Sequence, residues 1–123
     1  MAEFPPGVYY IGDPCYVIPD EQWDEYIDVV SAESNDTGMF HGSPTWSHYT
    51  AHGDGEYYNG SRSMALPVDS GTIGVVPEAL WAANLSEDDI AQLGYIFTSK
   101  SGFKAHYNNG VFTIGRFKIN TDF

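Results

Sequence analysis

The chain has 123 residues, and its 17 acidic and 5 basic side chains give a net charge of −12 at neutral pH. This length predicts one domain over residues 1–123, with a core large enough to need no metal or disulfide, and the single cysteine, Cys15, excludes an internal disulfide. A chain this negative repels nucleic acid and anionic membranes, so we expect neither as a direct partner.

The charge is unevenly distributed along the chain. Residues 1–61 carry 11 acidic side chains and no Lys or Arg, while four of the five bases (Lys100, Lys104, Arg116 and Lys118) lie near the C-terminus. Residues 1–20 lack a basic segment followed by a long apolar run, and no apolar run is long enough to cross a bilayer. We therefore expect no signal peptide and no membrane span.

The first strand and turn lead into the longest acidic stretch. Val8–Ile11 is β-branched and aromatic, which predicts a strand. Gly12-Asp13-Pro14 predicts a turn, and Cys15–Ile18 predicts a second short strand. Pro19 suits the first turn of a helix, and this helix should end near Ser31.

The expected helix is acidic in its first turns, where the helix dipole favours negative charge. Trp23, Tyr26, Ile27 and Val30 follow the spacing of one helical face, so we expect all four to pack against the core. Residues 32–43 are rich in Ser, Asn, Asp and Gly and predict a loop with at most a short strand at Met39–His41.

The middle of the chain predicts a series of short strands. Thr45–His52 reads as a strand, and Gly53-Asp54-Gly55 predicts a turn after which Glu56–Tyr58 returns antiparallel to it. Asn59-Gly60 predicts a second turn soon after, and Ser63–Val68 and Thr72–Val76 predict two further strands.

Two stretches share one pattern. Val17–Trp23 and Val75–Trp81 both read as two apolar residues, a proline, an acid and then a tryptophan. The repeat is either chance or a pair of equivalent strand-to-helix corners beside one sheet. In the second reading, Pro77 opens a short helix over Glu78–Asn84.

The last third carries the clearest local signals. Ser86 with Asp89 resembles a capping box at a helix start. Asn108-Asn109-Gly110 is a strong hairpin signal between Phe103–Tyr107 and Val111–Ile119. We therefore expect an α+β fold: a curved, mainly antiparallel sheet or partial barrel of seven to nine short strands with two or three short helices.

The residue pattern contains no phosphate loop, dinucleotide fingerprint, nucleophile elbow or paired-cysteine zinc motif. We expect no catalytic residue, no cofactor and no bound metal, and we expect Cys15 to be a packed, inert thiol. His48 and His52 share a face of the expected strand, but at ~3.3 Å per residue they lie about 13 Å apart, too far to share one ion on a straight strand.

An alternative site uses turn residues. Asp13, His52, Asp54 and Asp69 would form a ligand-binding, metal-binding or hydrolytic site if their turns meet at one end of the sheet. The competing interpretation is that Asp is simply a favoured turn residue. The C-terminal hairpin interleaves basic and aromatic residues, a pattern that can stack single-stranded nucleic acid, but the overall charge argues against this use and the competing interpretation is solvated lysines beside core phenylalanines. A second use is self-association, in which the basic hairpin of one copy meets the acidic helix of another and gives a homo-oligomer.

Three motifs carry a resemblance. They are Gly7–Ile18, followed by Trp23; Gly53-Asp54-Gly55-Glu56-Tyr57; and Val68–Gly74, which reads Val-Asp-Ser-Gly-Thr-Ile-Gly. In these motifs, over about a third of its length, the chain resembles a set of small uncharacterised proteins of bacteriophages and bacteria. The resemblance implies a phage-type or prophage accessory protein that acts in the host cytoplasm, and it assigns no functional residues.

Our leading hypothesis is a non-enzymatic protein that binds a basic surface of a host protein, as an inhibitor, an anti-defence factor or a nucleic-acid mimic. The residues expected to make this contact are acidic and lie in the helix and the loop after it: Asp20, Glu21, Asp24, Glu25, Asp28, Glu33 and Asp36. The alternatives are a small β-domain with a ligand or metal site at the Asp and His turns, and a self-assembling structural phage protein.

Overall fold

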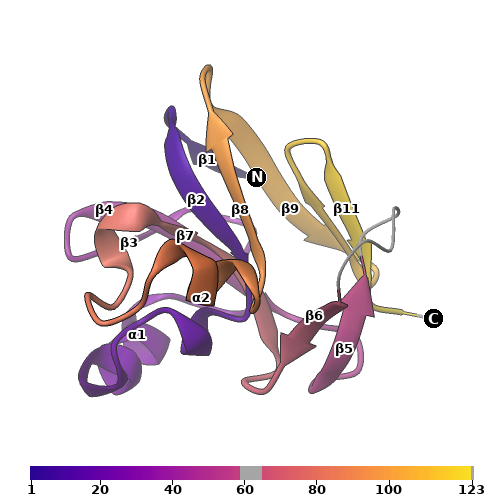
Figure 1. Ribbon diagram of the computed structural model, residues 1–123. Helices are drawn as coiled ribbons and strands as arrows, with labels where there is room; N and C mark the ends of the chain where they lie inside the picture. The colour runs from indigo at the N-terminus through magenta and orange to yellow at the C-terminus, as the bar shows by residue number, and fades with distance from the viewer. Residues whose placement is uncertain (59–64, 123) are drawn as a thin grey trace.

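A computed structural model describes residues 1–58 and 65–122 (Figure 1). Within these residues the strands form a five-stranded sheet of order β3-β4-β7-β2-β8, a four-stranded sheet of order β1-β9-β10-β11, and a two-stranded ribbon of β5 and β6. All of these pairings are antiparallel. The expected strand-rich, mainly antiparallel α+β class is therefore confirmed, although the strands form three sheets and no closed barrel.

The described residues contain eleven strands, two α-helices and three 3₁₀ helices. The strands are β1 (Ala2–Phe4), β2 (Gly7–Gly12), β3 (Gly38–Phe40), β4 (Ser43–Tyr49), β5 (Gly55–Tyr58), β6 (Ala65–Val68), β7 (Thr72–Pro77), β8 (Tyr95–Ser99), β9 (Phe103–Asn108), β10 (Val111–Ile114) and β11 (Phe117–Asn120). The helices are α1 (Trp23–Val29), α2 (Glu87–Ala91) and the 3₁₀ helices η1 (Pro14–Tyr16), η2 (Asp20–Gln22) and η3 (Glu78–Leu80). The sequence underestimated the number of strands.

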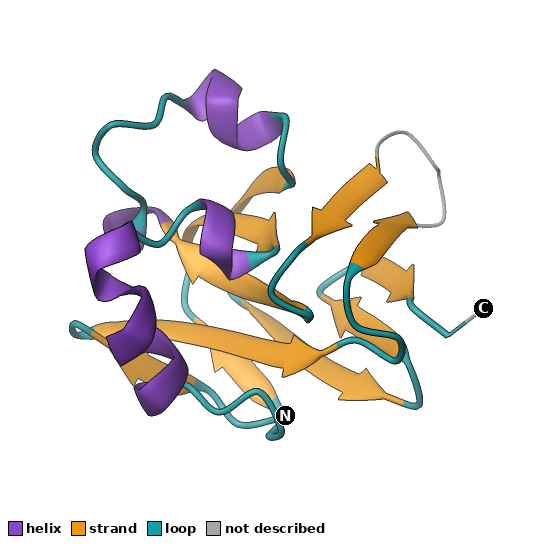
Figure 2. Cartoon of the chain, turned by 90° about the horizontal axis from the view of Figure 1, so that it is seen from below, coloured by secondary structure: helices purple, strands orange, loops and turns teal. Residues whose placement is uncertain are grey.

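Alternation along the strands of the five-stranded sheet creates two separate cores. Tyr9 and Ile11 of β2 face a core shared with the four-stranded sheet and the ribbon. Tyr10 faces the opposite way, into a core with Tyr26 of α1 and Ile90 of α2. Figure 2 shows the helices gathered on this second side. The helices and the second sheet thus cover opposite faces of one sheet.

The expected strand over Cys15–Ile18 is wrong, because the chain turns there into the 3₁₀ helix η1. Asp13 is its N-cap: the carboxylate accepts the backbone N–H of Cys15. Pro14 occupies the first helical position, where its missing N–H costs nothing. The capping bond and the proline therefore bend the chain away from the sheet immediately after β2.

Fewer side chains of helix α1 pack against the core than the sequence predicts. Tyr26 is 1% exposed; its ring stacks on Trp23 and meets Phe40 edge to face, and Val30, just after the helix, is also buried. Ile27 is 53% exposed, so its expected place in the core is wrong. Successive side chains of an α-helix are about 100° apart, so Ile27 points away from the core that Tyr26 faces in this seven-residue helix.

Two expected elements in the middle of the chain are also wrong. Glu56–Tyr58 does not return along β4, because β3 and β7 occupy both edges of β4; β5 pairs with β6 instead. The helix over Glu78–Asn84 shrinks to η3, since Trp81 is already extended and its indole donates to the carbonyl of Val76. The expected turn at Asn59-Gly60 and the start of the Ser63–Val68 strand lie outside the described residues.

Other local signals are confirmed. Ser86 and Asp89 form a reciprocal capping box at the start of α2. Asn109 and Gly110, with φ of 50° and 88°, form the two-residue turn between β9 and β10. The expected single strand over Val111–Ile119 is split into β10 and β11 by a second tight turn, in which Gly115 has φ 56°.

Candidate functional site

Asp13 is a buried hub that joins two turns. Its side chain is fully buried, at 0% exposure. One carboxylate oxygen accepts the N–H groups of Asp69 and Ser70, each at 2.7 Å. The other accepts the N–H of Cys15 at 2.9 Å and the hydroxyl of Ser70 at 2.7 Å. With four protein donors on two oxygens, Asp13 serves as a fixed link between the β2 corner and the β6–β7 turn.

Cys15 and Tyr16 sit beside this hub. Burial raises the pKa of the Cys15 thiol, and the neighbouring carboxylates of Asp13, Asp69 and Asp54 raise it further. The phenol of Tyr16 donates to Asp69, and burial followed by this bond raises the Tyr16 pKa. A thiol whose pKa is raised is a poor nucleophile at neutral pH. The surroundings of Cys15 therefore favour the inert thiol that the sequence predicts.

The turns that carry Asp13, Asp54 and Asp69 converge. The backbone bonds above join the first to the third. The N–H of Thr50 donates to the carbonyl of Gly71 at 3.0 Å, which joins the β4–β5 turn to the β6–β7 turn. The carboxylate of Asp54 lies next to Gly71: a side chain at that position would begin 3.8 Å from one of its oxygens. These three acids therefore lie in one region of the fold, as the alternative hypothesis requires.

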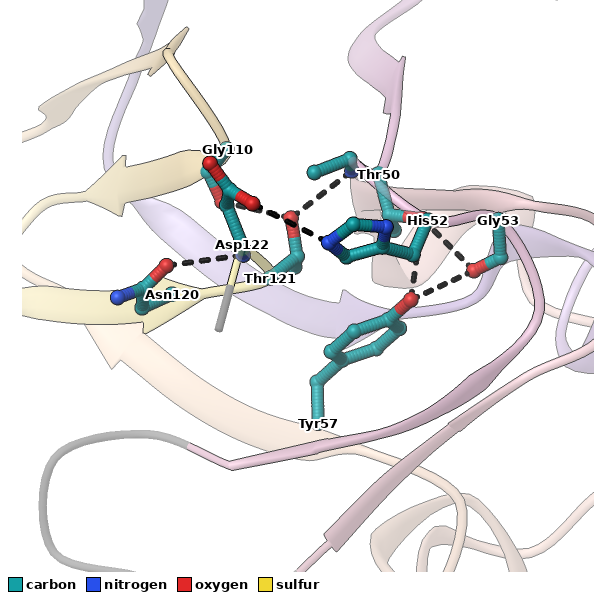
Figure 3. A network of polar contacts seen from close by, with 9 residues as sticks. Thr50, His52, Gly53, Tyr57, Gly110, Asn120, Thr121 and Asp122 are labelled. Atoms are coloured by element: carbon teal, nitrogen blue, oxygen red, sulfur yellow. Dashed lines mark hydrogen bonds and ion pairs between the residues drawn. The ribbon is translucent and has the colours of Figure 1, made fainter.

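His52 belongs to a different set of contacts (Figure 3). Its Nε2 lies 3.1 Å from an Asp122 carboxylate oxygen, and the neighbouring Ala51 N–H donates to the buried Thr121 hydroxyl. That hydroxyl donates to the carbonyl of Gly110 at 2.6 Å. His52 thus helps to hold the C-terminal residues against the β4–β5 turn.

Two cavities border these turns. One, of about 310 Å³, is lined by residues 52 and 54–57, and so includes His52 and Asp54. A larger one, of about 620 Å³, lies between the η1 corner and residues 82–85 and includes Cys15, Asp20 and Glu21. Asp13 and Asp69 line neither, so the four residues of the alternative site do not share a cavity.

Metal ligation has no support in the described part of the chain, where no group of three or more His, Cys, Asp or Glu side chains is placed to hold an ion. His48 stacks on Tyr107, with ring centroids 4.0 Å apart, and its Nδ1 lies 2.8 Å from the carbonyl oxygen of Tyr49. These contacts explain His48 without a metal.

The acidic residues of the leading hypothesis lie on α1, on η2 and in the loop that follows α1. Their side chains are all exposed: Asp20, Glu21, Asp24, Glu25, Asp28, Glu33 and Asp36. Glu25 contacts His41, with 2.9 Å between carboxylate oxygen and Nε2. No Lys or Arg that the structure describes forms an ion pair with any of the seven. We call these seven residues the acidic face.

The loop that carries Glu33 and Asp36 is held firmly to the strands. The Asn35 side chain exchanges two hydrogen bonds with the backbone of Tyr107, at 2.7 and 3.0 Å. The indole of Trp46 donates to the carbonyl of Ser34 at 2.8 Å. Both loop acids therefore sit on an ordered support.

The sequence did not identify Ser70, which supplies two of the four donors to Asp13. Its local signal is the Asp-Ser-Gly turn itself, which marked Asp69 and not its neighbour. A partner so distant along the chain leaves no local trace, so Ser70 emerges only from the three-dimensional structure.

No family model, curated protein or solved structure matches the chain. Among the described residues, no helix combines the length and apolar character needed to cross a membrane.

Proposed function

We propose that the chain is a small acidic, phage-type accessory protein that binds a basic surface of a host protein through the acidic face. The observation that carries this proposal is seven exposed carboxylates on neighbouring elements, none paired with a described Lys or Arg. Carboxylates that are not paired with Lys or Arg of the same protein can form ion pairs with a basic partner, and their field raises the rate at which that partner associates.

The support of the acidic face favours binding over mere solubility. Tyr26 fixes α1 on the sheet, and Asn35 fixes the following loop. A surface that is ordered before binding loses little conformational entropy when a partner docks. Ile27 and Val29 are each 53% exposed on the same helix. Apolar residues among charged ones are typical of protein interfaces, which combine an apolar centre with a polar rim.

The expected role is inhibition or anti-defence, with the acidic face acting in place of a nucleic acid on a basic host surface. An array of carboxylates resembles the phosphates of a nucleic acid in charge, and a protein that contacts phosphates with Lys and Arg binds it by the same electrostatics. Binding of this kind should weaken as the salt concentration rises.

Capture from host lysate tests the proposal with two matched variants. Asp24→Lys/Glu25→Lys/Asp28→Lys reverses three charges on α1. The control, Glu78→Lys/Glu87→Lys/Asp88→Lys, reverses three exposed acids on η3 and α2. We expect the first variant to lose the captured partner and the control to retain it. Equal capture by the wild type and the α1 variant would contradict the proposal.

The alternative ligand site has weaker support. Its turns converge, but the oxygens of Asp13 are occupied by four donors and His52 is engaged with Asp122. Self-assembly as a structural phage protein stays a prediction, for which a concentration-dependent mass in light scattering is the test.

A further inference from the structure

A cavity of about 440 Å³ lies beside β8, at an edge of the five-stranded sheet, and also borders the four-stranded sheet. It is lined by the end of β8, the turn from β8 to β9 and the turn from β10 to β11. Both turns lie at the top of Figure 1, at the opposite end of the view from α1. Strand β8 is an edge of the five-stranded sheet and, among the described strands, pairs only with β2.

Two of the four basic residues that the structure describes, Lys100 and Arg116, line this cavity, and no carboxylate does. Neither forms an ion pair within residues 1–58 and 65–122, whereas Lys104 on the neighbouring strand pairs with Glu3 at 3.6 Å. The rest of the protein is strongly negative, but charges further away than about 8 Å are largely screened at physiological ionic strength. The local environment of the cavity is therefore cationic.

The remaining lining is aromatic and hydroxylic. Phe97, Phe103 and Phe117 are each half-buried, and the ring of Phe97 lies 4.9 Å from that of Phe103 and 5.4 Å from that of Phe117. Thr98, Ser99 and Ser101 add three hydroxyl groups. An aromatic cluster with a few convergent polar groups is the usual lining of a small-molecule site, which typically encloses roughly 300 to 1,000 Å³.

We propose that this cavity binds a small aromatic anion of the nucleoside monophosphate class. Arg116 offers a planar guanidinium that matches a phosphate with two parallel hydrogen bonds, and Lys100 adds a second positive charge. The phenylalanine rings offer the packing surface that a nucleobase uses on aromatic side chains. The site is independent of the acidic face, since it uses other elements and the opposite charge.

A single nucleotide fits these features better than a nucleic-acid strand. A strand needs a positive groove that follows its backbone over several nucleotides. Here the described bases are confined to residues 100–118 and the acidic residues outnumber the basic ones over the chain as a whole. Lys100 and Arg116 therefore carry enough positive charge to bind one phosphate group, but not the several phosphates of a nucleic-acid strand.

Isothermal titration with nucleoside monophosphates tests the proposal, using AMP, GMP, CMP and UMP as probes. Adenosine and inorganic phosphate are the controls that lack the charge or the ring. We expect at least one nucleotide to bind with one-to-one stoichiometry and both controls to bind at least about tenfold more weakly. Lys100→Ala and Arg116→Ala should each lower the affinity by about tenfold, the usual effect of losing one charge-assisted hydrogen bond to a phosphate.

Lys118→Ala is the matched control, since Lys118 is an exposed base on β11 that does not line the cavity. We expect it to bind the nucleotide as the wild type does. No binding of any of the four nucleotides at millimolar concentration would overturn the proposal. Binding that survives in Lys100→Ala/Arg116→Ala, or that grows in proportion to the length of a single-stranded oligonucleotide, would also overturn it.

Discussion

Asp13 and the acidic face contain the same kind of side chain in opposite surroundings. Asp13 is fully buried, and four protein donors occupy its two oxygens. Asp24 and Asp28 are exposed on α1 with no described cation beside them. The difference lies in their surroundings: Asp13 holds two turns together through its buried oxygens, whereas the acidic face is exposed to solvent, where we propose that a basic partner binds it.

The comparison predicts a large loss of stability when the buried acid is removed. Asp13→Ala would remove the shared acceptor of three backbone N–H groups and the Ser70 hydroxyl, all of them in part-buried hydrogen bonds. Each unsatisfied buried donor costs about 1–3 kcal/mol, so we expect the free energy of unfolding to fall by about 3–5 kcal/mol. Urea denaturation measures it. The control, Asp28→Ala on the acidic face, should change it by less than about 0.5 kcal/mol.

Ser70→Ala tests how much of the stabilisation provided by Asp13 comes from the Ser70 hydroxyl and how much from the backbone donors. This variant removes the hydroxyl donor at 2.7 Å but keeps both backbone donors of the turn. We expect a loss of about 1–2 kcal/mol, smaller than that of Asp13→Ala, because the carboxylate keeps three of its four partners. A loss as large as that of Asp13→Ala would show that the hydroxyl, and not the backbone, holds the carboxylate.

Alkaline pH should lower the free energy of unfolding, through ionisable groups beside the Asp13 hub. The raised pKa values of Cys15, Tyr16 and Tyr10, each caused first by burial, keep these groups protonated in the folded chain. The unfolded chain releases the same protons between about pH 8.5 and 10. It therefore binds fewer protons than the folded chain, and stability declines as the pH rises above about 9. Urea midpoints at neutral and alkaline pH measure this, and Cys15→Ala should show a smaller decline.

The smallest expected effect on stability comes from the acidic face. Asp24→Lys/Glu25→Lys/Asp28→Lys should alter the free energy of unfolding by no more than about 1 kcal/mol, because exposed charges contribute little to folding. The sign is set by two opposing terms: less repulsion within an acidic protein and a less favourable first turn of α1. A loss of several kcal/mol would show that these acids hold the fold together as Asp13 does.

The sequence predicted elements whose cause is local. The turn at Asn109-Gly110 and the capping box at Ser86 depend on neighbouring residues only, and both are confirmed. The strand expected over Cys15–Ile18 failed because the Asp13 carboxylate caps a 3₁₀ helix there while it also binds a turn more than fifty residues away. The pairing of β5 depended on edges of β4 that other strands had already taken.

The candidate site likewise combines features that local sequence predicts with features that depend on residues far apart in the chain. Exposure of the acidic face follows from hydrophilic side chains beside a buried tyrosine, and the pattern of the sequence was sufficient to predict it. The hub could not be predicted, because Asp in a Gly-Asp-Pro turn reads as a turn residue whether its oxygens face solvent or another turn. The cavity at Lys100 and Arg116 likewise depends on two turns that are brought together by different strands, which the order of residues does not reveal.

Carboxylate footprinting tests the central claim most directly. The free protein and its captured complex are treated with a carbodiimide and an amine, and mass spectrometry measures the modification of each acid. We predict that Asp13 stays unmodified in both states, while the seven residues of the acidic face react in the free protein and are protected in the complex. Equal labelling of the acidic face in both states, with protection of other acids such as Glu87 and Asp88 instead, would contradict the account.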